Sequence, residues 1–305
     1  MTRHMTSLDR RSRRRMRLAP LGVGCVLTSA VLAGCGSILE GDPGADGGNG
    51  APRSGSYEYP TGSQDVVVSV DHAGRSVPPE YALRNTAEFL LLGDGTVIFP
   101  GAVNEPYPGV AIFPLQTTTF TEDQIQALLA AADEAGLLGE PIDYGKPGIS
   151  DQATTYVDIT VDGRTVSHSV YALDSEGDNE ANLSAASRAA RAALRDFLAT
   201  HSQDSGNGPF YQPDAVLAYR LPTSTEPPAA PENEQEPRTW PIATVPPPVA
   251  EGSPHSCVAV TGQEAADLLG ALAEANELTP WLIGTEVPAR LAFRPLLPGD
   301  PGCEE

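Results

Sequence analysis

Residues 155–171 constrain the fold more than any other part of the chain. Apolar and polar residues alternate over 155–161, the pair Asp162-Gly163 follows, and alternation resumes over 165–171. Asp-Gly between two alternating segments is typical of a two-residue type I′ turn, because both turn positions need a positive φ. The segment therefore predicts an antiparallel hairpin. Its apolar face should consist of Val157, Ile159, Val166 and Val170.

Further strands are predicted before this hairpin. Residues 65–70 are rich in β-branched side chains, and Gly93-Asp94-Gly95 separates two short apolar segments, 89–92 and 96–99. A three-residue loop with two glycines supplies the positive φ angles of a tight turn. We therefore expect a second hairpin here.

Two helices are predicted to cover these strands. Thr121 and Gln124 have the spacing of a capping box, and apolar residues recur at helical spacing from there to Gly136, which suits a left-handed helix end. A second helix is expected over about residues 179–200. Its apolar face would be Leu183, Ala186, Ala190, Leu194 and Phe197.

Residues 205–256 are rich in proline but too apolar for a solvated spacer. Short strands are expected over 215–221 and 239–245, with a loop around 224–236, and both should belong to the C-terminal unit. In that unit, residues 261–276 repeat the capped helix of 121–136 at an offset of 140. A shortened copy of the first unit is one explanation. The other is that any two capped amphipathic helices match in this way.

Together these elements predict an α+β protein with two lobes of antiparallel sheet, each covered by helix. The expected divisions are a signal peptide over 1–34, a flexible lipidated tether over 35–62, an α+β domain over 63–204, the proline-rich segment over 205–256 and a small β-α-β unit over 257–305.

Residues 1–35 have the pattern of a bacterial lipoprotein processing signal. Arginines cluster over 10–17, and an apolar run over 18–33, too short and too broken for a comfortable membrane span, leads to Leu32-Ala33-Gly34-Cys35. We expect cleavage before Cys35 and acylation of this residue, which would anchor the chain on the outer face of the cytoplasmic membrane. The alternative is a plain signal peptide with an incidental cysteine.

The charge balance disfavours one class of partner. The formal net charge is −21, and residues 1–34 hold seven arginines but one acidic residue, so the exported part is more acidic still. Phosphate-bearing partners need a basic surface, so we expect neither nucleic acid nor peripheral binding to anionic lipid. The glycine-rich tether would hold an acidic domain clear of the membrane.

Two cysteines remain for a disulfide. Cys25 leaves with the signal and Cys35 takes the lipid, so Cys257 and Cys303 should pair in an oxidising compartment. Such a bridge would restrict the unfolded chain by about 4 kcal/mol. Metal ligation is the alternative, although no CxxC spacing exists and His255 is the only nearby imidazole.

Few residues carry a recognisable chemistry. The sequence has no HExxH, GxSxG or SxxK and no phosphate-binding glycine loop, so we expect no metal and no cofactor. His168 should face inward opposite Val157, where it would be a base or, more commonly, a structural histidine. An acidic cluster before the second helix lacks the glycine and the final glutamate of a calcium loop, so favourable charge at a helix N-terminus explains it better. Its members are Asp174, Glu176, Asp178 and Glu180.

A polar region with aromatic neighbours follows the first helix. It is the best candidate for a recognition surface, and its residues are Asp143, Tyr144, Asp151 and Tyr156.

Four segments resemble a family of secreted actinobacterial lipoproteins described as hypothetical. They are FLLLGDGTVIFPG, AGLLGEPIDYGKPG, TYVDITVDGRTVSHSVYAL and RLAFRPLLPGD. The resemblance implies an envelope location and a fold, and it transfers no functional residue except Cys35.

These observations leave three functions open. We favour a non-catalytic lipoprotein that binds a protein or another envelope component through loops or sheet edges. An extracytoplasmic enzyme acting on cell-wall or peptide material would use Asp151 and Asp158 with His168. Binding of a small ligand between the two lobes is the third.

Overall fold

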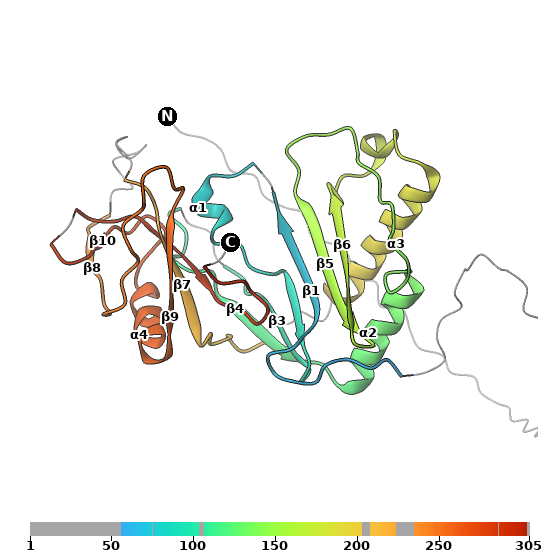
Figure 1. Cartoon of the computed structure of the whole chain (residues 1–305), viewed down its shortest axis with the longest axis horizontal. Helices are drawn as coiled ribbons and strands as arrows, with labels where there is room; N and C mark the ends of the chain where they lie inside the picture. Colours follow the sequence, from blue (N-terminus) through green and yellow to red (C-terminus); the bar gives the residue numbers. More distant parts are fainter. Residues whose placement is uncertain are drawn as a thin grey trace, which may run out of the picture. The chain divides into compact units, whose positions relative to one another are not determined.

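The computed structural model describes residues 56–74, 76–103, 107–202, 208–223, 235–285 and 287–303. The expected signal peptide, the lipidation site Cys35 and the tether up to residue 55 lie outside the described residues, as does most of the loop around 224–236. The described residues form a large antiparallel sheet, a smaller antiparallel sheet, a two-stranded parallel pair and a few helices (Figure 1). The α+β class predicted from the sequence is confirmed.

The large sheet has six strands in the order β4-β3-β2-β1-β5-β6. Both predicted hairpins are confirmed within it. Asp162 and Gly163 have φ values of 52° and 71°, and Val157 pairs with His168 across the turn that they form. The strands are β1 (Val66–Ala73), β2 (Phe89–Leu92), β3 (Thr96–Pro100), β4 (Leu115–Thr119), β5 (Thr154–Val161) and β6 (Arg164–Tyr171).

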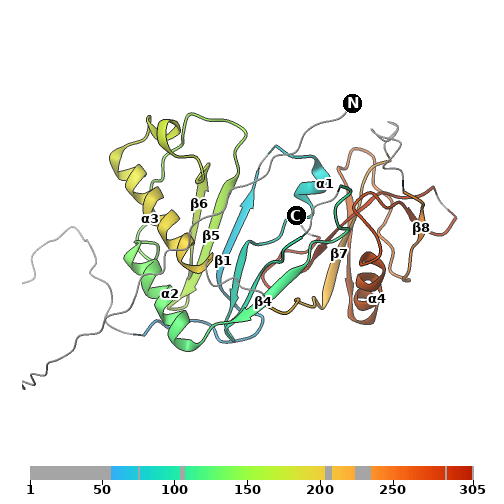
Figure 2. The same cartoon turned by 180° about the vertical axis from the view of Figure 1, so that it is seen from behind.

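Helices α2 (Glu122–Glu134) and α3 (Ala185–Ser202) cover one face of this sheet (Figures 1 and 2). The capping box of α2 forms as predicted: the Gln124 amide donates to the Thr121 hydroxyl at 3.3 Å, and the Thr121 amide donates to the Gln124 side chain at 2.9 Å. The helix buries Ile125, Leu128, Leu129 and Ala132 against the strands.

The second helix begins later than the sequence predicts. A 3-10 turn, η1 (Gly177–Glu180), occupies the expected start, and Ser184 begins α3 by accepting the Ser187 amide at 3.0 Å. The buried face of α3 includes Arg191 as well as Leu194 and Phe197. Hydrophobic spacing alone missed this arginine, because its partners come from elsewhere in the chain.

The folded region begins earlier than expected. Glycine-rich composition predicts a flexible tether up to residue 62, but Tyr57 is buried in the main core and its hydroxyl donates to Asp133 at 2.9 Å. Its amide donates to Gln126 at 2.7 Å. A buried aromatic ring with side-chain hydrogen bonds to α2 fixes this segment, and composition alone did not reveal that.

The small sheet has the order β11-β7-β9. The proline-rich segment supplies the expected strand as β7 (Ala215–Arg220), which lies at the centre, and β9 (Ser256–Thr261) and β11 (Leu291–Pro295) flank it. The strand expected over 239–245 is only β8 (Arg238–Thr239), which pairs in parallel with β10 (Trp281–Leu282). Helix α4 (Gly262–Leu272) follows β9 and buries Ala265, Leu268 and Leu272.

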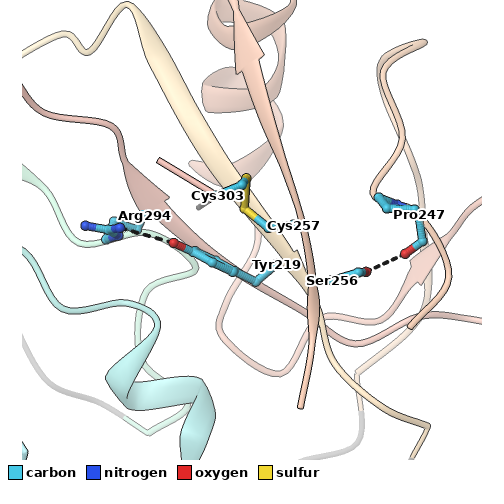
Figure 3. Close-up of a disulfide and its surroundings, with 6 residues drawn as sticks. All are labelled: Tyr219, Pro247, Ser256, Cys257, Arg294 and Cys303. Atoms are coloured by element: carbon cyan, nitrogen blue, oxygen red, sulfur yellow. Dashed lines mark hydrogen bonds between the residues drawn. A yellow bond between two sulfur atoms is a disulfide. The ribbon is translucent and has the colours of Figure 1, made fainter. Parts of the chain in front are cut away.

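Cys257 and Cys303 are joined by a disulfide with a Cα–Cα distance of 5.6 Å (Figure 3). The bond ties the last described residues to β9 in the small sheet. Beside it, the Arg294 guanidinium of β11 donates to the Tyr219 hydroxyl of β7 at 3.1 Å. The cysteine pairing predicted by elimination is therefore the one in the structure.

The two capped helices are similar only in part. Each lies in chain order between two parallel strands of its sheet, α2 between β4 and β5 and α4 between β9 and β11, although β10 follows α4 before β11. However, Thr261 makes no side-chain capping bond, and the Glu264 carboxylate accepts the Ala243 and Thr244 amides instead. The shared order of strands and helix agrees with a duplication, whereas the different cap does not. That the C-terminal unit is a shortened copy of the first unit therefore stays a prediction.

Candidate functional site

The predicted recognition surface is not one surface. Asp143 and Asp151 are exposed, and the Tyr156 side chain on β5 is 42% exposed. Tyr144 is instead buried, because its hydroxyl hydrogen-bonds to Nδ1 of His168 at 3.0 Å within the core. Burial raises the pKa of Tyr144 to about 12. The expectation that Tyr144 is a surface residue was wrong.

His168 faces inward opposite Val157, as predicted, and it is a structural residue. Its Nε2 donates to the Leu137 carbonyl at 2.9 Å, so both ring nitrogens are occupied. Asp158 neighbours Val157 on β5 and therefore faces the opposite side of the sheet. Asp151 is exposed in the segment before β5. The structure thus separates the three residues that the enzyme alternative requires.

The structure gives the acidic cluster before α3 a different role from the one that the sequence suggested, favourable charge at a helix N-terminus. Glu180 is buried and binds the guanidinium groups of Arg191 and Arg195, and Glu176 lies 3.1 Å from Arg195. Burial raises the pKa of Glu180, but the two arginines outweigh this effect and hold the pKa below its ordinary value. Ion pairs with arginine side chains, rather than the start of a helix, account for these two carboxylates.

A cleft of about 830 Å³ opens where β1 ends, beside the short helix α1 (Pro79–Ala82) and the C-terminal part of α3. Its volume is within the range of small-molecule sites. Its walls are largely apolar and come from the sheet, from α3 and from the segment in and before α1, which forms the rim of the cleft. They include Val70, Val77, Tyr81, Phe89, Phe99 and Leu198.

His72 and Glu88 form the polar end of this cleft. The His72 Nε2 and the Glu88 carboxylate are in direct contact, and Nδ1 lies 3.1 Å from the Thr155 hydroxyl. Asn85 supports the strand end, because its amide donates to the Asp71 carboxylate and to the His72 carbonyl, both at 2.7 Å. Asp174, which follows β6, completes the polar lining.

Strand geometry explains why these groups meet. Side chains alternate along β1, so His72 shares a face with Val68 and Val70, the face that the helices cover. Glu88 is placed by its amide, which donates to the Val70 carbonyl at 2.8 Å. Sequence reasoning missed this site, although the continued alternation after Val70 was a usable signal for the position of His72.

Electrostatics favours the charged form of His72. The hydrogen bond with Glu88 raises the pKa of His72, burial opposes the shift, and the nearby carboxylates of Glu88, Asp174 and Asp71 add to it, so the pKa lies above its ordinary value. The shift favours the imidazolium form of His72 beside the Glu88 carboxylate.

Thr155, His72 and Glu88 make the hydroxyl–imidazole–carboxylate contacts of a catalytic triad, but the resemblance ends with these contacts. Thr155 is 1% exposed and does not line the cleft, so its hydroxyl orients the imidazole and is closed to a substrate. Within the described part of the chain, no group of three histidine, cysteine or carboxylate side chains is placed to hold a metal ion.

A second cavity of about 850 Å³ runs along α4. Its lining is mainly apolar, and Phe210, on its rim, is 62% exposed. Ala266 and Gly270 of α4, and Ala273 directly after it, form part of its wall. It shares no lining residue with the His72 cleft among those described.

No protein-family model, curated protein or solved structure matches this chain.

Proposed function

We propose that this protein is a lipid-anchored, non-catalytic binding protein on the outer face of the cytoplasmic membrane, and that it binds an envelope component in the His72 cleft. The observation that carries the proposal is the cleft itself. It combines apolar walls with a small set of convergent polar groups, which is the usual composition of a ligand site.

Binding is favoured over catalysis by the arrangement of the reactive groups. Asp151, Asp158 and His168 lie apart, and the hydroxyl that contacts the cleft histidine, that of Thr155, is buried. The Glu88 carboxylate and the buried Thr155 hydroxyl fix the orientation of the His72 imidazole, which suits recognition of a ligand.

The anchor is supported by the sequence of residues 1–35, in which an arginine cluster and an apolar run precede Cys35. Among the described residues, no helix is long and apolar enough to cross a bilayer. Cys35→Ala should therefore release the protein from washed membranes into the soluble fraction. Retention of this variant in the membrane would count against a lipid anchor at Cys35.

Site-specific photo-crosslinking in the native membrane tests the cleft. A photoreactive phenylalanine analogue replaces Tyr81 at the rim of the cleft or, as the matched control, Tyr156 on β5. The two side chains are 43% and 42% exposed, so unspecific collisions should label both equally. We expect a defined adduct at Tyr81 that mass spectrometry identifies, and none at Tyr156.

Three outcomes would overturn the proposal. Equal labelling at both positions, or none at Tyr81, would remove the cleft as the binding site. A specific adduct at Tyr156 alone would place recognition on the exposed residues of the loop and strand around Asp151 and Tyr156, as the sequence predicts.

A further inference from the structure

We propose that the second cavity, called the α4 groove below, is a binding site for a single-chain amphiphile whose head group carries hydroxyls and no negative charge. The alkyl chain lies along α4, and the head group lies at the end of the groove near Asp214. The α4 groove and the His72 cleft share no described lining residue, so this inference is independent of the proposed function.

Backbone contacts hold the walls of the α4 groove in place. Besides α4, the walls are formed by the segments 110–115 and 210–214. The second segment is bonded to the first turn of α4, the two segments are bonded to each other, and the chain just after α4 is bonded to the chain just before residue 110. The three hydrogen bonds run from the Gly262 amide to the Asp214 carbonyl at 3.3 Å, from the Tyr211 amide to the Leu115 carbonyl at 2.8 Å, and from the Glu277 amide to the Gly109 carbonyl at 3.0 Å. They close a frame around about 850 Å³, so the site is preformed.

The inside of this frame suits an extended apolar chain. Apart from the backbone of α4 and the adjoining residues, no heavy atom lies within 4 Å of the position that a Cβ would take at Gly270, so the space beside the helix is open. From Gly262 to Leu272 the helix rises about 15 Å, which gives the groove its length. The larger apolar side chains that face this space include Ile112, Phe113, Leu115, Phe210 and Leu269.

The polar groups of the lining come from one short stretch of chain. Tyr211, Gln212 and Asp214 supply a phenol, a carboxamide and a carboxylate. The bond from Gly262 to Asp214 places this stretch beside the start of α4. The three groups offer both donors and acceptors, which is what the hydroxyl groups of a ligand require. The groove therefore has an apolar body and one polar end, as an amphiphile does.

The charges at this end disfavour an anionic head group. Asp214 is the only charged residue in the described lining, and its carboxylate forms no ion pair with another described residue. The internal segments that the structure does not describe contain neither lysine nor arginine after Arg75. A carboxylate or phosphate would lose hydration here without gaining a counter-ion, and Asp214 would repel it.

Calorimetric titration of the expected mature chain, residues 36–305, tests the ligand class, because this chain retains every residue that the structure describes. The probes are octyl glucoside, hexyl glucoside and octanoate, each below its critical micelle concentration. We expect saturable binding of octyl glucoside. Hexyl glucoside should bind about tenfold more weakly, because it buries two fewer methylene groups. Octanoate should also bind more weakly, and Asp214→Asn should narrow its difference from octyl glucoside.

Two substitutions fill the α4 groove without changing the charge. Ala266→Leu and Gly270→Leu each add a side chain where the alkyl chain lies, and each should weaken binding of octyl glucoside about tenfold. Ala189→Leu is the matched control, because Ala189 is an exposed helical alanine of α3 outside both cavities. This control should leave the affinity unchanged, and urea unfolding checks that all three variants keep the wild-type fold.

Four results would overturn the inference. They are no saturable binding of octyl glucoside, equal affinities for the octyl and hexyl glucosides, octanoate binding as tight as that of octyl glucoside, and equal effects of Ala266→Leu and Ala189→Leu. The first three need no substitution, so the inference is testable even if a filling variant does not fold.

Discussion

Arg84 and Glu277, 193 positions apart, form a buried ion pair with an N···O distance of 2.6 Å. Arg84 follows α1 at the rim of the cleft, and Glu277 follows α4, which packs on the small sheet. Glu277 also accepts the Gly109 amide at 2.8 Å, and the Arg84 guanidinium lies 4.5 Å from the centre of the Phe113 ring. The pair therefore joins the segment that carries the cleft rim to the C-terminal part of the fold.

Glu277→Gln should strongly destabilise the protein. The Arg84 side chain is only 3% exposed, so the substitution leaves a buried charge without its counter-ion, at a cost of about 3 to 5 kcal/mol. Glu274→Gln is the control, because its partner Arg238 is partly exposed and Glu274 itself is 73% exposed. The control should cost no more than about 1 kcal/mol in urea unfolding. Similar losses in the two variants would contradict a structural role for the buried pair.

Arg191→Ala should be among the most damaging changes in α3. The fully buried guanidinium binds Glu180 and donates to the carbonyl oxygens of Tyr171 and Ala172. Its loss removes one of the two arginines that bind the buried Glu180, together with two hydrogen bonds to carbonyl groups in the core, and should lower the free energy of unfolding by about 3 to 5 kcal/mol. Arg188→Ala, one turn earlier and exposed, should change stability little in the same chemical unfolding experiment. If Arg191→Lys were as stable as the wild type, a planar guanidinium would not be required at this position.

Removal of His72 should change how stability depends on pH. The pKa of His72 is raised from 6.5 in the folded protein, chiefly by Glu88. The resulting stabilisation is therefore fully present below the unfolded value and is lost as pH rises through the folded pKa. The difference in unfolding free energy between the wild type and His72→Gln should be larger at acidic pH than at alkaline pH. A difference that grows with pH would contradict the ion pair.

Leu128→Ala and Leu268→Ala compare the two helices directly. Both leucines are buried, so each change should cost about 2 to 5 kcal/mol through the cavity that it leaves. The small sheet depends on the bond between Cys257 and Cys303, which restrains β9 directly before α4. Reduction should therefore make Leu268→Ala much more sensitive to protease and Leu128→Ala much less so. Equal sensitivity after reduction would show that the bond does not stabilise the C-terminal sheet selectively.

Local sequence patterns were sufficient to predict the turns and caps that depend only on neighbouring residues. The turn at Asp162-Gly163 and the capping box at Thr121 were predictable, because backbone conformation and hydrogen bonds within a few residues decide them. The pairing of Cys257 with Cys303 followed from counting the cysteines that remain when Cys25 is assigned to the expected signal peptide and Cys35 to the expected lipid anchor.

Only the tertiary structure decided which polar residues contact one another. Burial of Tyr144 is possible because its hydroxyl donates to His168, and burial of Arg191 is possible because Glu180 and two carbonyl groups accept its hydrogen bonds. His72 meets Glu88 because β1 and β2 are adjacent. Each of these contacts joins residues separated by 11 to 24 positions along the chain. Periodicity places a side chain on a face but does not identify its partner, because the partner depends on strand order and helix packing. By itself the sequence determined the two hairpin turns, the capping box and the cysteine pair, and the arrangement of the elements in space made the cleft.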